Sequence, residues 1–292
     1  MLNIIKSSAQ KPNSALRQSK RKPDEDNLTW LRRHLTPNEE RLHLVLLGGA
    51  DALSFRLRVA QSHLRHDLTP SRWSHALLLD GATVRAGKDN MPPALTNVRT
   101  FEISLDPAQG FGFTPPTNAL QHGRLRDHTD VTKFPNIALL SAPVAWAQAR
   151  EMLVEVEAKG TGAKRGGFFQ HQRAVLDATE LVILWLAYVW GVGRASNPLL
   201  EGHGIPSAAM IEVVLGAAGF DLTPGLESRA SCPEAIWQSA KWWHEYHNRD
   251  VQPVAPAPTD SQPAAPSPTA AAAQQDMALV GFWYAPHELI SE

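Results

Sequence analysis

Ser207 is the residue whose type and position most directly suggest chemistry. It follows Pro206 at the start of residues 206–219, where apolar side chains recur at helical spacing and Gly219 supplies a stop. We therefore expect a helix that begins at Pro206 and Ser207. A hydroxyl at the positive end of a helix dipole is well placed for a nucleophile, because the dipole stabilises a developing anion. The plainer interpretation is that Ser207 only caps the helix by accepting a backbone N–H hydrogen bond.

Cys232 is a second candidate nucleophile. It is the only cysteine, and it precedes Pro233, a favourable first residue for the helix expected at 233–247. Pairing with His203 or His75 would give a thiol–imidazole site, whereas the alternative is a side chain packed beneath the helix. A single cysteine also excludes an intramolecular disulfide and a zinc site built from several cysteines.

The elements that must position these residues fall into two groups. Strands are expected first and most helices follow them, an order typical of the α+β class. The expected strands lie at 42–47, within 69–81, at 98–105 and at 136–140. The expected helices lie at 55–64, 145–158, 173–190, 207–219 and 233–247.

Composition divides the chain into four parts. Residues 1–27 are polar and basic, which predicts a disordered arm, and residues 28–250 form the folded domain. Residues 251–276 are rich in Pro and Ala, which predicts a semi-extended linker. Residues 277–292 form an apolar tail, and we expect it to dock either on its own domain or on a partner.

Three sequence blocks stand in an order that resembles a known family. Trp73-Ser74-His75 comes first, Thr100-Phe101-Glu102-Ile103 follows, and Pro206-Ser207-Ala208-Ala209-Met210-Ile211 precedes Ala218-Gly219-Phe220-Asp221-Leu222. This order is similar to that of the permuted papain-like hydrolases, the YiiX-like and lecithin:retinol acyltransferase-like branch of the NlpC-type superfamily. In that branch an "SHV" histidine on a strand comes first, and a "CSELV" helix carrying the nucleophilic cysteine comes later. The resemblance implies an antiparallel sheet packed against helices, with flexible termini.

The resemblance also implies roles for three residues. His75 matches the general base, Glu102 falls where a third, orienting polar group could sit, and Ser207 occupies the position of the cysteine. Serine there is a departure from the family, because a hydroxyl is far less acidic than a thiol and needs proton removal during attack. This chain either uses serine, is inactive, or is an engineered Cys→Ser form. A second alignment places Ala178 at the cysteine position and would leave no nucleophile there.

The function implied by the family is hydrolysis or transfer of an amide- or ester-linked acyl group. The apolar, Trp-rich helices favour an acyl lipid over a peptidoglycan peptide as substrate, and a role as an antibacterial toxin effector is compatible with the family. The alternative is a catalytically inactive papain-like binding module that recognises a protein partner. A delivery or immunity protein could also contact the tail.

Composition sets limits on partners and location. The net charge of −1 gives no overall attraction to nucleic acid, although peripheral membrane contact stays open. No cofactor is expected, and no metal is expected because the pairs His63/His66 and His244/His247 lack the partners of a zinc motif. With no signal peptide and no apolar run long enough to span a bilayer, we expect a soluble, cytoplasmic protein in the producing cell. Export by a signal-independent system is compatible with that location.

Overall fold

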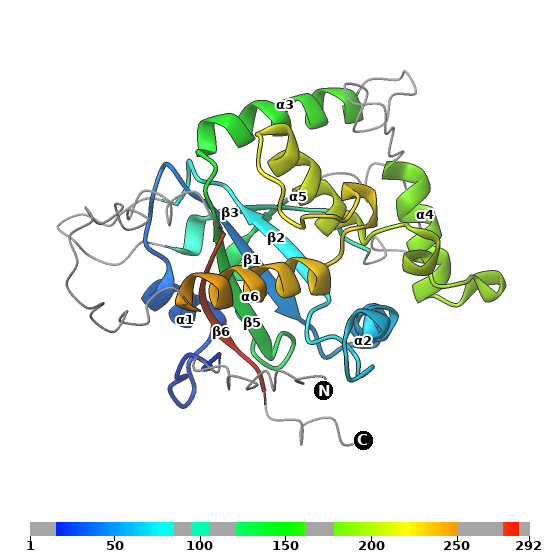
Figure 1. Ribbon diagram of the computed structural model, residues 1–292, viewed down its shortest axis with the longest axis horizontal. Coiled ribbons are helices and arrows are strands. Elements are labelled where there is room, and N and C mark those ends of the chain that lie inside the picture. Colours follow the sequence, from blue (N-terminus) through cyan, green and yellow to red (C-terminus); the bar gives the residue numbers. More distant parts are fainter. Residues whose placement is uncertain (1–15, 85–94, 106–120, 162–177, 250–276, 286–292) are drawn as a thin grey trace, which may run out of the picture.

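One six-stranded antiparallel sheet organises the described part of the chain. The computed structural model describes residues 16–84, 95–105, 121–161, 178–249 and 277–285. The strands are β1 (Leu42–Gly48), β2 (His75–Leu79), β3 (Arg99–Glu102), β4 (Gln121–Arg124), β5 (Asn136–Ala142) and β6 (Ala278–Trp283). They lie in the order β4-β3-β2-β1-β5-β6, and every neighbouring pair is antiparallel (Figure 1). The α+β class and the antiparallel sheet expected from the sequence are therefore confirmed.

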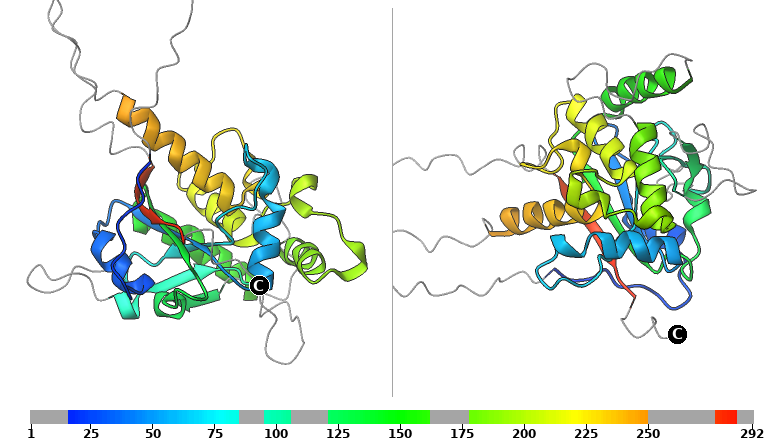
Figure 2. Two further views of the ribbon diagram at one scale, coloured as in Figure 1. Left: turned by 90° about the horizontal axis from the view of Figure 1, so that it is seen from below. Right: turned by 90° about the vertical axis from the view of Figure 1, so that its right-hand side faces the viewer.

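The two faces of the sheet support layers of unequal size. On one face α1 (Asn27–His34) packs against odd-numbered residues of the central strands, such as Val45 and Leu77. On the other face five helices pack against even-numbered residues, such as Leu44 and Leu78. These helices are α2 (Ala52–Ala60), α3 (Trp146–Thr161), α4 (Ala178–Val189), α5 (Pro206–Ala217) and α6 (Pro233–Arg249). Figure 2 shows α1 separated from α2, α4 and α6 by the sheet.

Short 3-10 helices make several of the connections. They are η1 (Ser62–Leu64), η3 (Leu95–Asn97), η4 (Leu125–His128), η5 (Val192–Arg194), η6 (Pro198–Glu201) and η7 (Ser228–Ala230). Within the described ranges no helix combines the length and the apolarity that crossing a membrane requires.

Most expected elements are present, with shifted boundaries. The strand predicted at 98–105 is shorter, since β3 ends at Glu102, and the helix predicted at 55–64 divides into α2 and η1. The first part of the helix predicted at 173–190 lies outside the described residues, and α4 begins at Ala178. Neither α1 nor β4 was predicted. β4 is four residues without an apolar side chain at an edge of the sheet, and α1 begins at Asn27, the boundary between the predicted arm and the predicted domain, where no helix was expected.

The described part of the predicted N-terminal arm is held against the domain. Asn27 is 1% exposed, and its side-chain amide donates to the backbone oxygens of His128 and Phe134, both at 3.0 Å. The carboxylate of Glu25 accepts two hydrogen bonds from Arg33, each at 2.6 Å. The prediction of a disordered arm is therefore wrong for residues 16–27, because buried polar contacts fix a segment that is poor in apolar side chains. Residues 1–15 and the predicted linker at 251–276 lie outside the described residues.

Residues 278–283 of the predicted apolar tail form the edge strand β6, and residues 286–292 of that tail lie outside the described residues. β6 pairs with β5 in a register that joins Ile137 to Trp283 and Ala138 to Phe282, with an irregularity at residues 139–140. Of the two docking possibilities that the sequence left open, the structure shows docking on the chain's own domain.

Candidate functional site

Ser207 lies in the first turn of α5 and does not cap it. The N-cap is Ile205, which makes no side-chain cap hydrogen bond, and Pro206 occupies the first helical position. The entry to the helix is fixed by backbone bonds from Gly204 to Arg229 and from Ile205 to Ser231. The prediction of Ser207 as the N-cap is therefore wrong by two positions, because the proline begins the helix. The Ser207 side chain is nearly buried, at 5% exposure.

His75 begins β2, and its side chain lies on the α1 face of the sheet. Strand alternation places it with Leu77 and Leu79, which belong to the core on that face. Its ring meets the ring of Phe134 edge-on, with centroids 5.6 Å apart. Its Nδ1 lies 2.6 Å from the Ser74 hydroxyl, which also accepts a hydrogen bond from the backbone N–H of Gly49.

The structure does not bring His75 and Ser207 together as a catalytic pair. The helix that carries Ser207 packs on the opposite face, where Ala208, Ala209 and Met210 join the core formed with Ala76 and Leu78. Because successive side chains of a strand point to opposite faces, α5 contacts β2 through the neighbours of His75. The dyad suggested by the family resemblance is thus corrected. The helix and the strand that carry the two matching residues pack together, but the histidine faces away from the helix.

Glu102 lies on the same face of the sheet as His75, because Thr100, two residues before it, pairs with Leu79. Its Oε1 lies 3.3 Å from Nε2 of His128, a residue in η4 that sequence reasoning missed because it belongs to no pattern. Burial alone would raise the pKa of Glu102. The hydrogen bond from His128 and the nearby positive charges of His128, His75 and Lys133 outweigh burial and lower this pKa. Glu102 is therefore a stable carboxylate.

The Glu102 cluster is closely packed. Thr100 is fully buried beside it, and its Oγ1 has no hydrogen-bond partner among the described residues. A Cβ at Gly123 would lie 2.6 Å from both Thr100 Oγ1 and Glu102 Oε1, so only glycine fits there. The ring of Phe134 contacts His128 as well as His75, and the centroids of the Phe134 and His128 rings lie 5.3 Å apart. The cluster can hold charge in place, but it presents no accessible nucleophile.

Cys232 is not a usable nucleophile. It is 0% exposed, and burial raises the pKa of its thiol to about 12, although the backbone N–H groups of Glu234 and Ala235 partly oppose the shift. The interpretation as a side chain packed beneath the helix is confirmed, since Cys232 belongs to the main core and its carbonyl accepts from Ile236. Ala178, the position of the second alignment, is the first residue of α4.

Among the described residues, no group of three His, Cys, Asp or Glu side chains is arranged to hold a metal ion. His63 and His66, one of the pairs with ligand spacing, are exposed, and His63 contacts the Ala60 carbonyl through Nδ1. In His244/His247, the side chain of His247 lies outside the described part.

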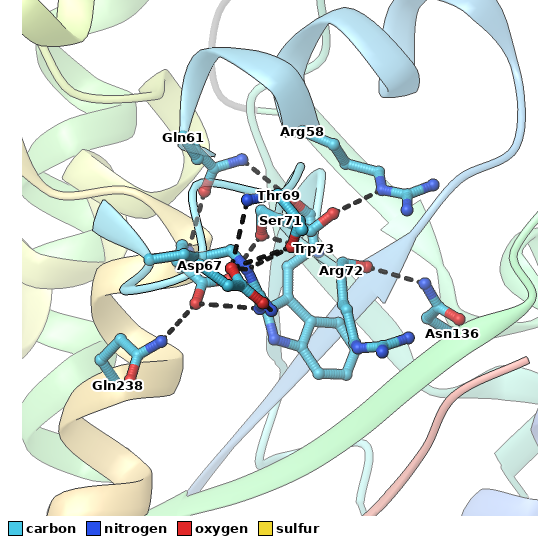
Figure 3. A network of polar contacts seen from close by, with 11 residues as sticks. Arg58, Gln61, Asp67, Thr69, Ser71, Arg72, Trp73, Asn136 and Gln238 are labelled. Carbon is cyan, nitrogen blue, oxygen red and sulfur yellow. Dashed lines mark hydrogen bonds and ion pairs between the residues drawn. The ribbon is translucent and has the colours of Figure 1, made fainter. Parts of the chain in front are cut away.

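A polar network fixes the loop that leads into β2 (Figure 3). The backbone of Trp73 is held twice, by its N–H donating to Ser71 Oγ at 3.0 Å and its carbonyl accepting from Gln61 at 2.8 Å. Ser71 Oγ donates to Glu234 at 2.6 Å, and Arg58 donates to the Ser71 carbonyl at 2.6 Å. The 0% exposed Glu234 thus links this loop to the first turn of α6.

The loop and α6 contact the end of the tail through aromatic rings and one arginine. The Arg72 guanidinium lies over the ring of Tyr284, and the Tyr284 ring also contacts the rings of Trp73, Trp237 and Phe282 at 5.6, 6.1 and 5.1 Å. We call the three contact residues Arg72, Trp73 and Trp237 the Tyr284 contact group. Sequence reasoning missed it, since its three residues come from two distant segments.

Comparison of the chain with protein-family models, with curated proteins and with solved structures finds no significant match. The placement of the residues themselves must therefore decide between the possible functions.

Proposed function

We propose that this chain is a catalytically inactive, papain-like binding module that recognises a protein partner. The observation that carries the proposal is the separation of Ser207 and His75 by the sheet. Acyl transfer requires the base within about 2.6–3.2 Å of the nucleophile's proton, directly or through one water. A base on the far face of a sheet does not meet that requirement.

The packing of α5 on β2 supports the papain-like part of the proposal, because this helix and strand carry the residues that match the family motifs. Position 207 carries a serine where the family has its nucleophilic cysteine, and the one cysteine of the chain, Cys232, is fully buried. The nucleophile that the family uses is therefore absent, although the helix and the strand that would carry the catalytic pair are present. Such a framework is free to serve recognition, since fold does not fix function.

A protein partner is favoured over an acyl lipid because the domain already binds an extended segment of its own chain. Of the Trp residues behind the lipid expectation, Trp185 and Trp237 are packed in the main core at 0% and 2% exposure, and Trp190 and Trp242 are exposed. The sheet edge and the Tyr284 contact group, by contrast, already hold an extended peptide, the chain's own residues 277–285. The surface is therefore suited to a polypeptide in strand conformation.

The catalytic half of the proposal is tested by restoring the family nucleophile. The chain, its Ser207→Cys variant and the double variant Ser207→Cys/His75→Ala are assayed on lipid extract and on peptidoglycan, with circular dichroism confirming that each is folded. We expect no hydrolysis by any of the three. Hydrolysis gained with Ser207→Cys and lost in the double variant would overturn the proposal and favour the hydrolase.

A further inference from the structure

β6 is attached to the domain differently from the strands it joins. It follows α6 only after 27 residues, 250–276, a stretch rich in Pro and Ala. It is an edge strand, and of its six residues only Gly281 and Phe282 are buried. Its hold on the sheet therefore depends on backbone pairing with β5 and on a few side chains.

Those side chains occupy specific places. Phe282 is 4% exposed and meets the Trp237 ring at 5.1 Å, while Tyr284, just beyond the strand, lies against the Tyr284 contact group. Gly281 faces Ser19, His34 and Trp30, and a Cβ there would lie 2.8 Å from Ser19 Oγ. The site therefore accommodates a small residue at position 281, an aromatic residue at position 282 and a second aromatic residue at position 284.

The Tyr284 contact group is held mainly by bonds within the domain. Trp73 is held by Gln61 and Ser71, as described above, and the Arg72 carbonyl accepts from Asn136 Nδ2 at 3.0 Å, while Asn136 Oδ1 accepts from the tail residue Ala285. Figure 3 shows the bond from Asn136 joining the loop to β5, and Ser71 also donates to Glu234 at the start of α6. A site fixed in this way retains its shape when its occupant leaves, which lowers the ordering cost of binding.

We propose that the outer edge of β5 and the Tyr284 contact group form a binding site for an extended peptide of a partner protein, and that residues 277–285 are a tethered occupant which such a peptide displaces. The inference rests on the proposed function as a binding module. The recognised segment carries the pattern of Gly281, Phe282 and Tyr284, and its backbone pairs with β5 as an added strand.

The tether sets the strength a competing peptide must have. A tether of 27 residues rich in Pro and Ala is expected to give the tail an effective concentration of about 1 mM at its site. A tail segment with a dissociation constant of about 10 μM would then occupy the site about 99% of the time. A partner must therefore bind more tightly than the free tail segment, or be supplied in multivalent form.

The experiment uses the full chain with a protease recognition sequence inserted into residues 255–270. The cut and uncut proteins are titrated with a fluorescent peptide of residues 277–286, and binding is followed by anisotropy. A control peptide carries Phe282→Ala and Tyr284→Ala. Near-ultraviolet circular dichroism reports whether the domain stays folded.

We expect the cut protein to remain folded, to exchange its tail for the labelled peptide and to ignore the control peptide. The uncut protein should bind the labelled peptide about 100-fold more weakly, because the tethered tail competes. A cut tail that does not exchange within a day, or a domain that unfolds once the tail leaves, would show an integral strand and overturn the proposal.

A second measurement separates the possible occupants. If the uncut chain forms a concentration-dependent dimer that Tyr284→Ala abolishes, the site takes a second copy of this chain and the assignment to a separate partner is wrong. Failure of the proposed function and failure of this inference give different results. Hydrolysis by the Ser207→Cys variant would show that the domain is not an inactive module, regardless of the result of the peptide titration. Failure of exchange would leave the inactivity untouched.

Discussion

The guanidinium carbon of Arg72 lies 4.2 Å from the centroid of the Tyr284 ring. This contact joins the loop before β2 to the residue after β6, across more than two hundred positions of sequence. Burial raises the pKa of the Tyr284 hydroxyl, so the ring stays neutral while the arginine lies against its face.

Arg72→Gln should loosen the tail without unfolding the domain. A cation–π contact contributes about 0.5–2 kcal/mol, so we expect hydrogen exchange of the amides in β6 to accelerate by roughly 2- to 30-fold. Exchange in β1 should stay unchanged. Tyr284→Phe keeps the ring and serves as the matched control, with β6 exchange close to that of the original chain. Equal acceleration in β1 and β6 would show a global effect instead.

Cys232 should be inert in the folded protein. With the pKa of its thiol raised to about 12 by burial, the thiolate is essentially absent at about pH 8. We expect no labelling by a thiol reagent over hours in buffer and complete labelling in guanidinium chloride. Labelling in buffer at the rate of free cysteine would contradict the burial of this residue and reopen its candidacy as a nucleophile.

Glu212 should make the protein less stable as the pH rises. It is 2% exposed, and burial raises the pKa of its carboxyl to about 7 despite two hydrogen bonds from Thr223. A carboxyl whose folded pKa exceeds its unfolded value binds its proton more tightly when folded. Stability therefore falls as the pH rises between about 4.5 and 7, by on the order of 3 kcal/mol.

The free energy of unfolding, measured by urea titration across that range, checks the Glu212 prediction. Glu212→Gln keeps an oxygen for Thr223 and cannot ionise, so the decline should be much smaller. Glu40→Gln, at an exposed position, should leave the decline unchanged. An identical pH profile for Glu212→Gln and the original chain would refute the assignment to this carboxyl.

Glu102 should act in the opposite direction at lower pH. Its folded pKa lies below its ordinary value of 4.5, mainly because His128 donates to it and positive groups lie near. The stability it contributes is present above about pH 4.5 and is lost as the pH falls through the folded pKa. Glu102→Gln should be less stable at neutral pH and should show a flatter decline in Tm below about pH 4.5. A decline as steep as that of the original chain would count against the Glu102–His128 pair.

The sequence revealed the framework better than the site. The apolar runs of β1 and β5 and the proline starts of α5 and α6 are local signals, and all four elements lie close to where they were predicted. The face on which His75 lies is not a local signal. It depends on strand register, and a shift of one residue reverses every side chain.

Contacts made by distant segments were equally beyond sequence reasoning. His128 reaches Glu102 through the turn of η4, and Tyr284 reaches Arg72 only because β6 pairs with β5. The buried bonds of Asn27 likewise turn a segment with the composition of a disordered arm into part of the fold. Composition reports the average tendency of a segment, whereas these outcomes depend on single partners.

The pairing of β5 with β6 also has a consequence for biosynthesis. β5 ends at Ala142, and its partner begins at Ala278, so a ribosome must add more than a hundred further residues before this border of the sheet can close. During that interval the backbone donors and acceptors along β5 face outward, which is the condition under which nascent chains associate wrongly. Chaperone engagement should therefore be greatest in the interval between emergence of the two strands.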